Sequence, residues 1–155
     1  MTLTVNDPFD LQRFVIAQAE NHDDALAELA AGRKQSHWMW YVFPQLRGLG
    51  ESAMAQEFGI GSLTEATAYL QHPLLGTRLL QCCEITLRIT GRSAREIFGT
   101  PDDLKLRSCA TLFAAASPTG SVFARLLDRY YAGIPDERTL VLLRERGEMI
   151  AEHHA

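Results

Sequence analysis

The chain has 155 residues, a mass of 17.3 kDa and a formal net charge of −4. With 46% hydrophobic and 22% charged residues, its composition is that of a single folded domain and unlike that of a disordered or membrane-embedded chain. The mild acidity lacks the basic field that draws proteins onto DNA, RNA or anionic lipid, so we expect neither a nucleic-acid nor a membrane partner.

Helical spacing of apolar residues predicts an all-α fold, with one domain over residues 7–150 and short tails at 1–6 and 151–155. A strand is conceivable only at Trp40-Tyr41-Val42-Phe43, where the pattern is ambiguous. Prolines at helix starts, glycines after helix ends and two capping boxes, Ser62 to Glu65 and Ser93 to Glu96, set the boundaries. We expect a bundle of about seven to eight helices, in chain order near 8–20, 22–31, 63–72, 73–90, from 94, 101–116, 122–132 and 136–150.

The predicted helix near 104–116 is apolar around most of its circumference, which is typical of a helix surrounded by others. We therefore expect it at the centre of the bundle. Its polar residues Lys105 and Arg107 are expected to extend from the first turns and to pair with Asp102 or Asp103.

The cysteines and the N-terminus indicate a cytoplasmic protein. There are three cysteines, an odd number, and Cys82 and Cys83 are adjacent, so we expect free thiols in a reducing compartment. Residues 1–10 lack the basic and apolar regions of a signal peptide, and no run of about 20 apolar residues could form a membrane span.

The segment 34–50 stands out because it holds both tryptophans and has four aromatic residues within six positions, from Trp38 to Phe43. Aromatic rings beside hydrogen-bonding side chains can hold a planar ligand by stacking while the polar groups fix its orientation. The guanidinium of Arg47 can bind a carboxylate or phosphate through two parallel hydrogen bonds. The alternative is that these rings fill the core and that backbone carbonyls satisfy their polar atoms.

Two sequence motifs resemble a bacterial family of small all-helical proteins of unknown function that genomes often label "calpastatin". The motifs are SHWMW and FPQLRGLG at 36–40 and 43–50, and DDLKLRS with TLF at 102–108 and 111–113. The resemblance covers about residues 7–143 and implies an all-helical fold without an established activity or ligand. It also implies that the two motifs meet in space. Calpastatin proper is a long disordered protease inhibitor, which the compact composition of this chain does not match.

These observations leave three hypotheses. The first is a pocket for a planar anionic small molecule, nucleotide-like, with no reaction and no cofactor assigned. Its predicted ligand-binding residues are Ser36, His37, Trp38, Trp40, Gln45, Arg47, Lys105, Arg107 and Ser108. The second is a protein-interaction module with an aromatic surface, and the third is a purely structural motif in which Arg47 or Arg107 meets Asp103. Exposure of the tryptophans distinguishes the three.

Catalytic signatures are weak, and the sequence indicates neither a reaction nor an oligomeric state. There is no Cys-x-x-Cys or His-Glu-x-x-His pattern, so no metal site is expected, and the glycine-rich nucleotide fingerprints are missing. A nucleophile at Ser108 or Cys109 with His37 as base would rest on spacing alone. We expect both residues to be packed in the core.

Overall fold

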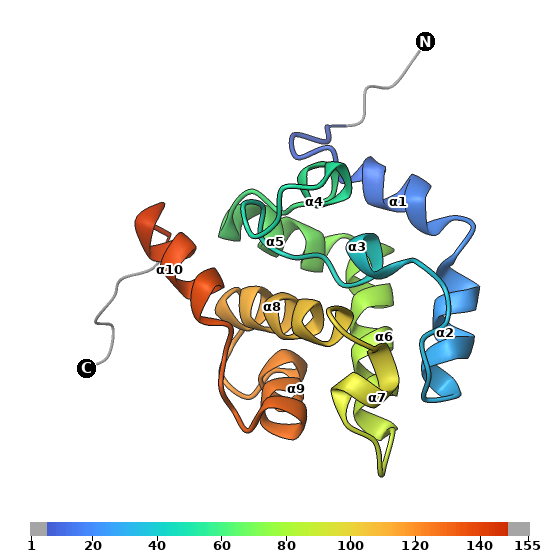
Figure 1. Cartoon of the computed structure of the whole chain (residues 1–155). Helices are drawn as coiled ribbons and strands as arrows, with labels where there is room; N and C mark the ends of the chain where they lie inside the picture. Colours follow the sequence, from blue (N-terminus) through green and yellow to red (C-terminus); the bar gives the residue numbers. More distant parts are fainter. Residues whose placement is uncertain (1–5, 149–155) are drawn as a thin grey trace.

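The computed structural model describes residues 6–148, and in this range the predicted all-α fold is confirmed (Figure 1). Between residues 6 and 148 the only bridge between extended segments is an isolated parallel one that joins Leu46 to Ile60. No helix in this range has the length and apolar character needed to cross a bilayer. The helices there are α1 (Gln12–Gln18), α2 (His22–Ala30), α3 (Met39–Val42), α4 (Ala53–Glu57), α5 (Leu63–Gln71), α6 (Leu75–Arg88), α7 (Ala94–Phe98), α8 (Asp102–Ala115), α9 (Val122–Tyr131) and α10 (Glu137–Glu145).

Seven of these helices have seven residues or more, while α3, α4 and α7 are short turns. The last helix, predicted over 136–150, ends at Glu145, because Gly147 after it takes a left-handed conformation (φ 73°). Most of the two predicted tails lies outside the described residues. The ambiguous stretch after Trp40 is helical, because it belongs to α3.

Helix α8 is the central element that its composition predicted. It packs against α5, α7, α9 and α10 (Figure 1). Leu106, Leu112 and Phe113 on this helix are fully buried. Leu104, at its start, is 53% exposed and marks the part of α8 that its neighbours leave uncovered. That uncovered part becomes one wall of the site described below.

The capping signals set most helix starts. The Ser93 box is complete, because its hydroxyl accepts from the Glu96 amide (3.1 Å) and the Glu96 carboxylate accepts from the Ser93 amide (2.8 Å). At Ser62 only the first bond forms, since the Glu65 carboxylate pairs instead with Arg13 at 2.8 Å.

The start of α1 and the presence of α4 also differ from the prediction. Helix α1 begins at Gln12 rather than near Pro8, because Asp10 takes a left-handed conformation (φ 53°) that interrupts the first turn. The Asp7 carboxylate accepts from the amides of Leu11 and Gln12 (2.8 and 3.0 Å) and starts the helix there. Helix α4 was not expected; it begins where the Ser52 hydroxyl accepts from the Ala55 amide.

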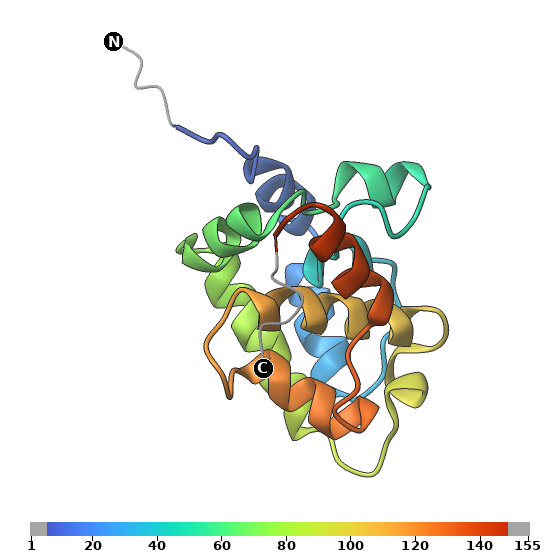
Figure 2. The ribbon, with the colours of Figure 1, turned by 90° about the vertical axis from the view of Figure 1, so that its left-hand side faces the viewer.

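Helix α10 crosses α8 on one side of the molecule (Figure 2). Its start is bonded to α8, since the Asp136 amide donates to Thr111 Oγ1 at 2.8 Å. The Asp136 carboxylate in turn accepts from the amide and hydroxyl of Thr139, at 3.0 and 2.6 Å, and so caps α10. These bonds place the first turn of α10 beside the uncovered part of α8.

Candidate functional site

The two sequence motifs pack against each other, as predicted. Lys34 Nζ lies 2.8 Å from Asp102 Oδ2, and Lys105 Nζ lies 3.1 Å from Asp102 Oδ1. The ammonium of Lys105 also lies over the indole of Trp40, 4.1 Å from the ring centroid. One carboxylate therefore joins the segment 34–50 to the first turn of α8 through two lysines.

Burial by itself would raise the pKa of Asp102, but the hydrogen bonds from Lys34 and Lys105 outweigh it and hold the pKa below its ordinary value. The carboxylate is thus ionised at neutral pH. It partly neutralises Lys105 without covering it.

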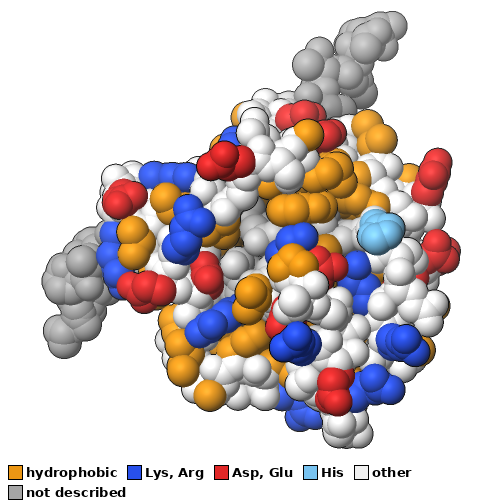
Figure 3. Space-filling view, in the orientation of Figure 1, with side chains coloured by type: hydrophobic (Ala, Val, Ile, Leu, Met, Phe, Trp, Pro, Cys, Tyr) orange, Lys and Arg blue, Asp and Glu red, His pale blue; other side chains and the backbone are white. Residues whose placement is uncertain are grey.

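A cleft with a volume of about 340 Å³ lies between the segment 40–50, the start of α8 and the start of α10. Figure 3 shows that hydrophobic side chains lie next to lysine and arginine side chains on the face of the molecule drawn in Figure 1. The cleft is lined by Trp40, Gln45, Leu49, Gly50, Pro101, Leu104, Lys105, Ser108, Asp136 and Arg138. Apolar atoms make up most of its walls, and five of its ten lining residues are polar or charged, a mixture found in small-molecule sites.

Two cations face this cleft from different helices. Lys105 comes from α8, and Arg138 comes from α10 and donates to the backbone oxygen of Leu49 at 3.3 Å. The carboxylate of Asp136, which caps α10, also lines the cleft and offsets one of these charges. With Lys34 and Asp102, the group has three cations and two carboxylates, an excess of one positive charge.

Gln45 lines the cleft and is only 8% exposed. Its backbone is held on the C-terminal side, because the Gln45 oxygen accepts from the Ile60 amide (2.8 Å) and the Arg47 amide donates to the Ile60 oxygen (2.7 Å). Its side-chain Nε2 atom is buried without a hydrogen-bond partner. A buried donor in this condition is unusual in a folded protein.

His37 lies next to the cleft rather than in it. A smaller hollow, of about 80 Å³, is lined by Lys34, His37, Met39, Trp40, Asp102 and Lys105. Trp40 and Lys105 border both spaces, so the hollow and the cleft are neighbours.

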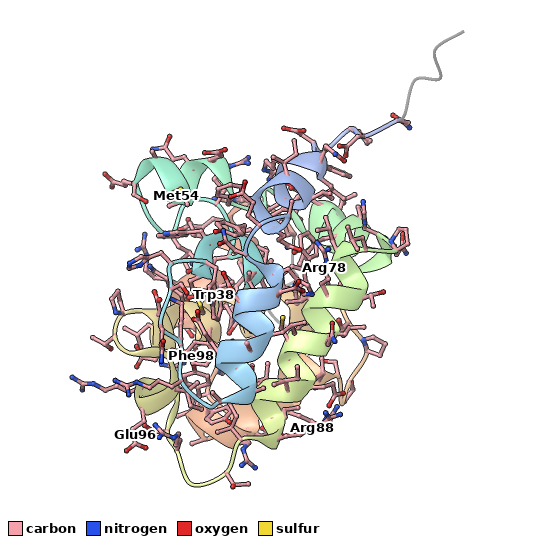
Figure 4. The ribbon with its side chains drawn as sticks, turned by 90° about the vertical axis from the view of Figure 1, so that its right-hand side faces the viewer. Trp38, Met54, Arg78, Arg88, Glu96 and Phe98 are labelled. Carbon is pink, nitrogen blue, oxygen red and sulfur yellow. The ribbon has the colours of Figure 1, made fainter. Side chains whose placement is uncertain are left out.

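Ser36 and Trp38 are bound to α2 instead. The Glu28 carboxylate accepts from the amides of Gln35 and Ser36, from the Ser36 hydroxyl, and from the indole nitrogen of Trp38 at 2.9 Å. We call Glu28, Gln35, Ser36 and Trp38 the Glu28 clamp. Trp38 is 1% exposed and lies inside the molecule beside α2 (Figure 4). Burial alone would raise the pKa of Glu28, but the bonds from Ser36, Gln35 and Trp38 lower it to about 2.

The two arginines of the predicted set bind backbone oxygens away from the cleft. Arg47 donates to the oxygens of Gly59 (2.8 Å) and Gln56 (3.2 Å). Arg107 donates to the oxygen of Ile134 at 2.9 Å and lies over the ring of Tyr131. The structure thus brings Trp40, Gln45, Lys105 and Ser108 of the predicted set together, with His37 adjacent.

The lining residues outside the predicted ligand-binding set are Leu49, Gly50, Pro101, Leu104, Asp136 and Arg138. Arg138 reaches the cleft because α10 packs beside α8. In the sequence, Arg138 lies in a charged helix segment with no feature that marks it as a binding residue.

The nucleophile hypothesis gains no support from the geometry. Burial raises the pKa of the Cys109 thiol well above its usual value, which removes the thiolate. Ser108 is 7% exposed, and its hydroxyl donates to the Leu104 oxygen at 3.2 Å. This bond leaves the hydroxyl oxygen able to accept from a ligand.

Comparison with known proteins identifies relatives of the whole domain. A family model described as "Protein of unknown function (DUF1810)" matches residues 8–143. The crystal structure of the conserved hypothetical protein Rv1873 from Mycobacterium tuberculosis is similar, with 57% sequence identity and a TM-score of 0.88. The match covers 89% of this chain and 99% of that one. No curated protein matches the chain. The chain belongs to the DUF1810 family of proteins of unknown function.

Proposed function

We propose that the protein binds a small planar anion, nucleotide-like in shape and charge, in the cleft between the segment 40–50, α8 and α10. The observation that carries this proposal is the presence of two cations, Lys105 and Arg138, at a cleft of about 340 Å³ with largely apolar walls. This volume lies near the lower end of the range for small-molecule sites.

In this proposal, charged side chains bind the anionic group of the ligand and apolar side chains contact its planar body. Lys105 and Arg138 bind the anionic group, and the guanidinium of Arg138 can form two parallel bonds to a phosphate or carboxylate. Leu49, Leu104 and the indole of Trp40 provide the apolar surface for the planar body.

A panel of AMP, GMP, UMP, CMP and ribose 5-phosphate, titrated by calorimetry, tests the proposal. We expect at least one nucleotide to bind in the micromolar to millimolar range and to change the fluorescence of Trp40. Trp38, which is 1% exposed, would contribute little to that change.

The variants Lys105→Gln and Arg138→Gln should each weaken binding about tenfold. Arg144→Gln is the matched control, because Arg144 lies on the same helix but does not line the cleft. The proposal fails if no member of the panel binds at millimolar concentration, or if all three variants bind as the wild type does.

The second candidate is a surface for a protein partner, favoured by Leu104, which is 53% exposed at the rim of the cleft, and by Ile134, which is 56% exposed. Its test is Leu104→Ser in a pull-down with the intact protein as bait. A partner lost in Leu104→Ser but retained in Arg138→Gln would favour this candidate over the anion site.

A further inference from the structure

We propose that Gln45 determines the specificity of the cleft, because its side-chain amide donates a hydrogen bond to an acceptor on the ring edge of a heterocyclic ligand. This inference rests on the proposed function and names its ligand class: a planar heterocycle, such as a nucleobase, that carries an anionic group.

The first observation is the unpaired donor. Gln45 is only 8% exposed. Its side chain lines the cleft, yet its Nε2 atom has no hydrogen-bond partner. Leaving a buried donor unpaired costs folding free energy. A ligand that supplies the acceptor would remove that cost on binding.

The second observation is the contrast with Gln18, the other glutamine with so little exposure. Gln18 is 2% exposed, and its Nε2 donates to the Tyr41 oxygen (2.7 Å) and to the Tyr69 hydroxyl (3.1 Å). Its Oε1 accepts from Arg78 at 3.3 Å. This fold therefore satisfies a buried glutamine completely where the residue is structural.

The third observation is the rigid position of Gln45. The bonds between the backbone of 45–47 and Ile60 hold the residue in place. Gly59 allows this close approach, because a Cβ there would lie 2.6 Å from the Cβ of Arg47. With its backbone held here and its side chain 8% exposed, Gln45 has little freedom left to lose when it bonds to a ligand edge.

A buried water is the competing partner for Nε2. A hollow of about 10 Å³ behind Gln45, room for about one water, is lined by Trp40, Leu46, Leu49, Ala55 and Phe58 as well as by glycines. Its polar lining comes from Gln45 and from the backbone, so a water there would bond to these groups. The melting temperatures compared below distinguish a donor that a water satisfies from one that is unpaired.

The first experiment compares the melting temperatures of Gln45→Met and Gln18→Met. Methionine keeps the length of the side chain and removes its polar atoms. We expect Gln45→Met to melt at the wild-type temperature or a few degrees higher, and Gln18→Met to melt several degrees lower because its partners lose their bonds. A similar loss in both variants would show that a structural partner satisfies Gln45, and would overturn the inference.

The second experiment titrates both proteins with AMP, GMP, UMP, CMP and ribose 5-phosphate. Wild type should bind its best nucleotide at least about tenfold more tightly than ribose 5-phosphate, which lacks a ring edge. Gln45→Met should lose about five- to tenfold in affinity for that nucleotide, with binding of ribose 5-phosphate unchanged within about twofold.

The outcomes separate the two proposals. If Gln45→Met keeps the affinity and the base preference of the wild type, the role of Gln45 is wrong and the anion site stands. If the wild type binds none of the panel, both are wrong.

Discussion

Trp38 and Trp40 are two residues apart, yet they lie in regions of opposite character. Trp38 is buried in the Glu28 clamp, where its indole nitrogen and the amide and hydroxyl of Ser36 all donate to the Glu28 carboxylate. Trp40 is half-buried at the rim of the cleft, beside a lysine with room for another partner and a glutamine nitrogen with none. The segment 34–50 thus has two parts. The polar groups around Trp38 are hydrogen-bonded within the protein, and we call this part the structural half. The part around Trp40 and Gln45 lines the cleft and has a donor without a partner.

This difference shows that density of aromatic residues does not by itself indicate a ligand site. The clamp accounts for Ser36 and Trp38 through stability, while the cleft accounts for Trp40, Gln45 and the residues that meet them from α8 and α10. Substitutions in the first half should therefore change stability, and those in the second should change binding.

The largest expected effect contrasts the tryptophans directly. Trp38→Ala should lower the free energy of unfolding by about 3–5 kcal/mol, because it removes a fully buried ring and one bond to Glu28. Trp40→Ala should cost about 1–2 kcal/mol, since part of its ring is exposed. Urea melts followed by circular dichroism measure both. Equal losses would erase the contrast between the two halves.

The start and the later turns of α8 offer a second comparison. Leu112→Ala and Phe113→Ala should each cost about 2–5 kcal/mol, because both side chains are fully buried. Leu104→Ala, on the wall of the cleft, should cost less than about 1 kcal/mol at 53% exposure. If Phe113→Ala were as mild as Leu104→Ala, α8 would not be the centre of the bundle.

Glu28→Gln tests the clamp, and we expect a loss of about 1–2 kcal/mol at pH 7 from weaker hydrogen bonds. The pKa of Glu28 is about 2 in the fold and 4.5 ordinarily. Because the folded value is the lower one, the ionised carboxylate stabilises the fold above pH 4.5, and this stability is lost as the pH falls towards 2.

Urea melts between pH 7 and pH 2.5 should therefore bring wild type and Glu28→Gln closer together in acid. Asp102 contributes an acid-sensitive loss of the same sign in both proteins, so their difference isolates Glu28. A constant difference at every pH would contradict the assigned role of the Glu28 charge.

The smallest expected change in stability belongs to the cleft. Arg138→Gln should change the free energy of unfolding by less than about 0.5 kcal/mol, because Arg138 is exposed and its one bond, to the Leu49 oxygen, is long at 3.3 Å. Thermal melts without ligand measure this. A loss above about 1 kcal/mol in the free energy of unfolding would show that Arg138 has a structural role.

Local signals in the sequence predicted most of the helices. Capping residues such as Ser93 and turn residues such as Gly133, which has a φ of 76°, act within a few positions of the chain. The exceptions were also local but ambiguous. Pro8 permits a helix start, yet Asp10 delays it, and the five residues of α4 are too few to show a period.

The site was harder to predict because its members come together only through the tertiary fold. Contact between 34–50 and the start of α8 was predictable from two polar motifs among core residues. The role of Arg138 was not, since it depends on where α10 crosses α8. Arg47 shows the reverse: its guanidinium binds carbonyls near the end of α4, a helix the sequence did not reveal.

The pairing of Lys34 and Lys105 with Asp102 has a consequence for the entropy of binding. A free lysine side chain samples many rotamers, and an incoming anion must restrict them. Here the carboxylate and the indole of Trp40 hold the Lys105 ammonium in place during folding. The loss of rotamer freedom therefore occurs before any ligand arrives, and an anion meets a charge already in position.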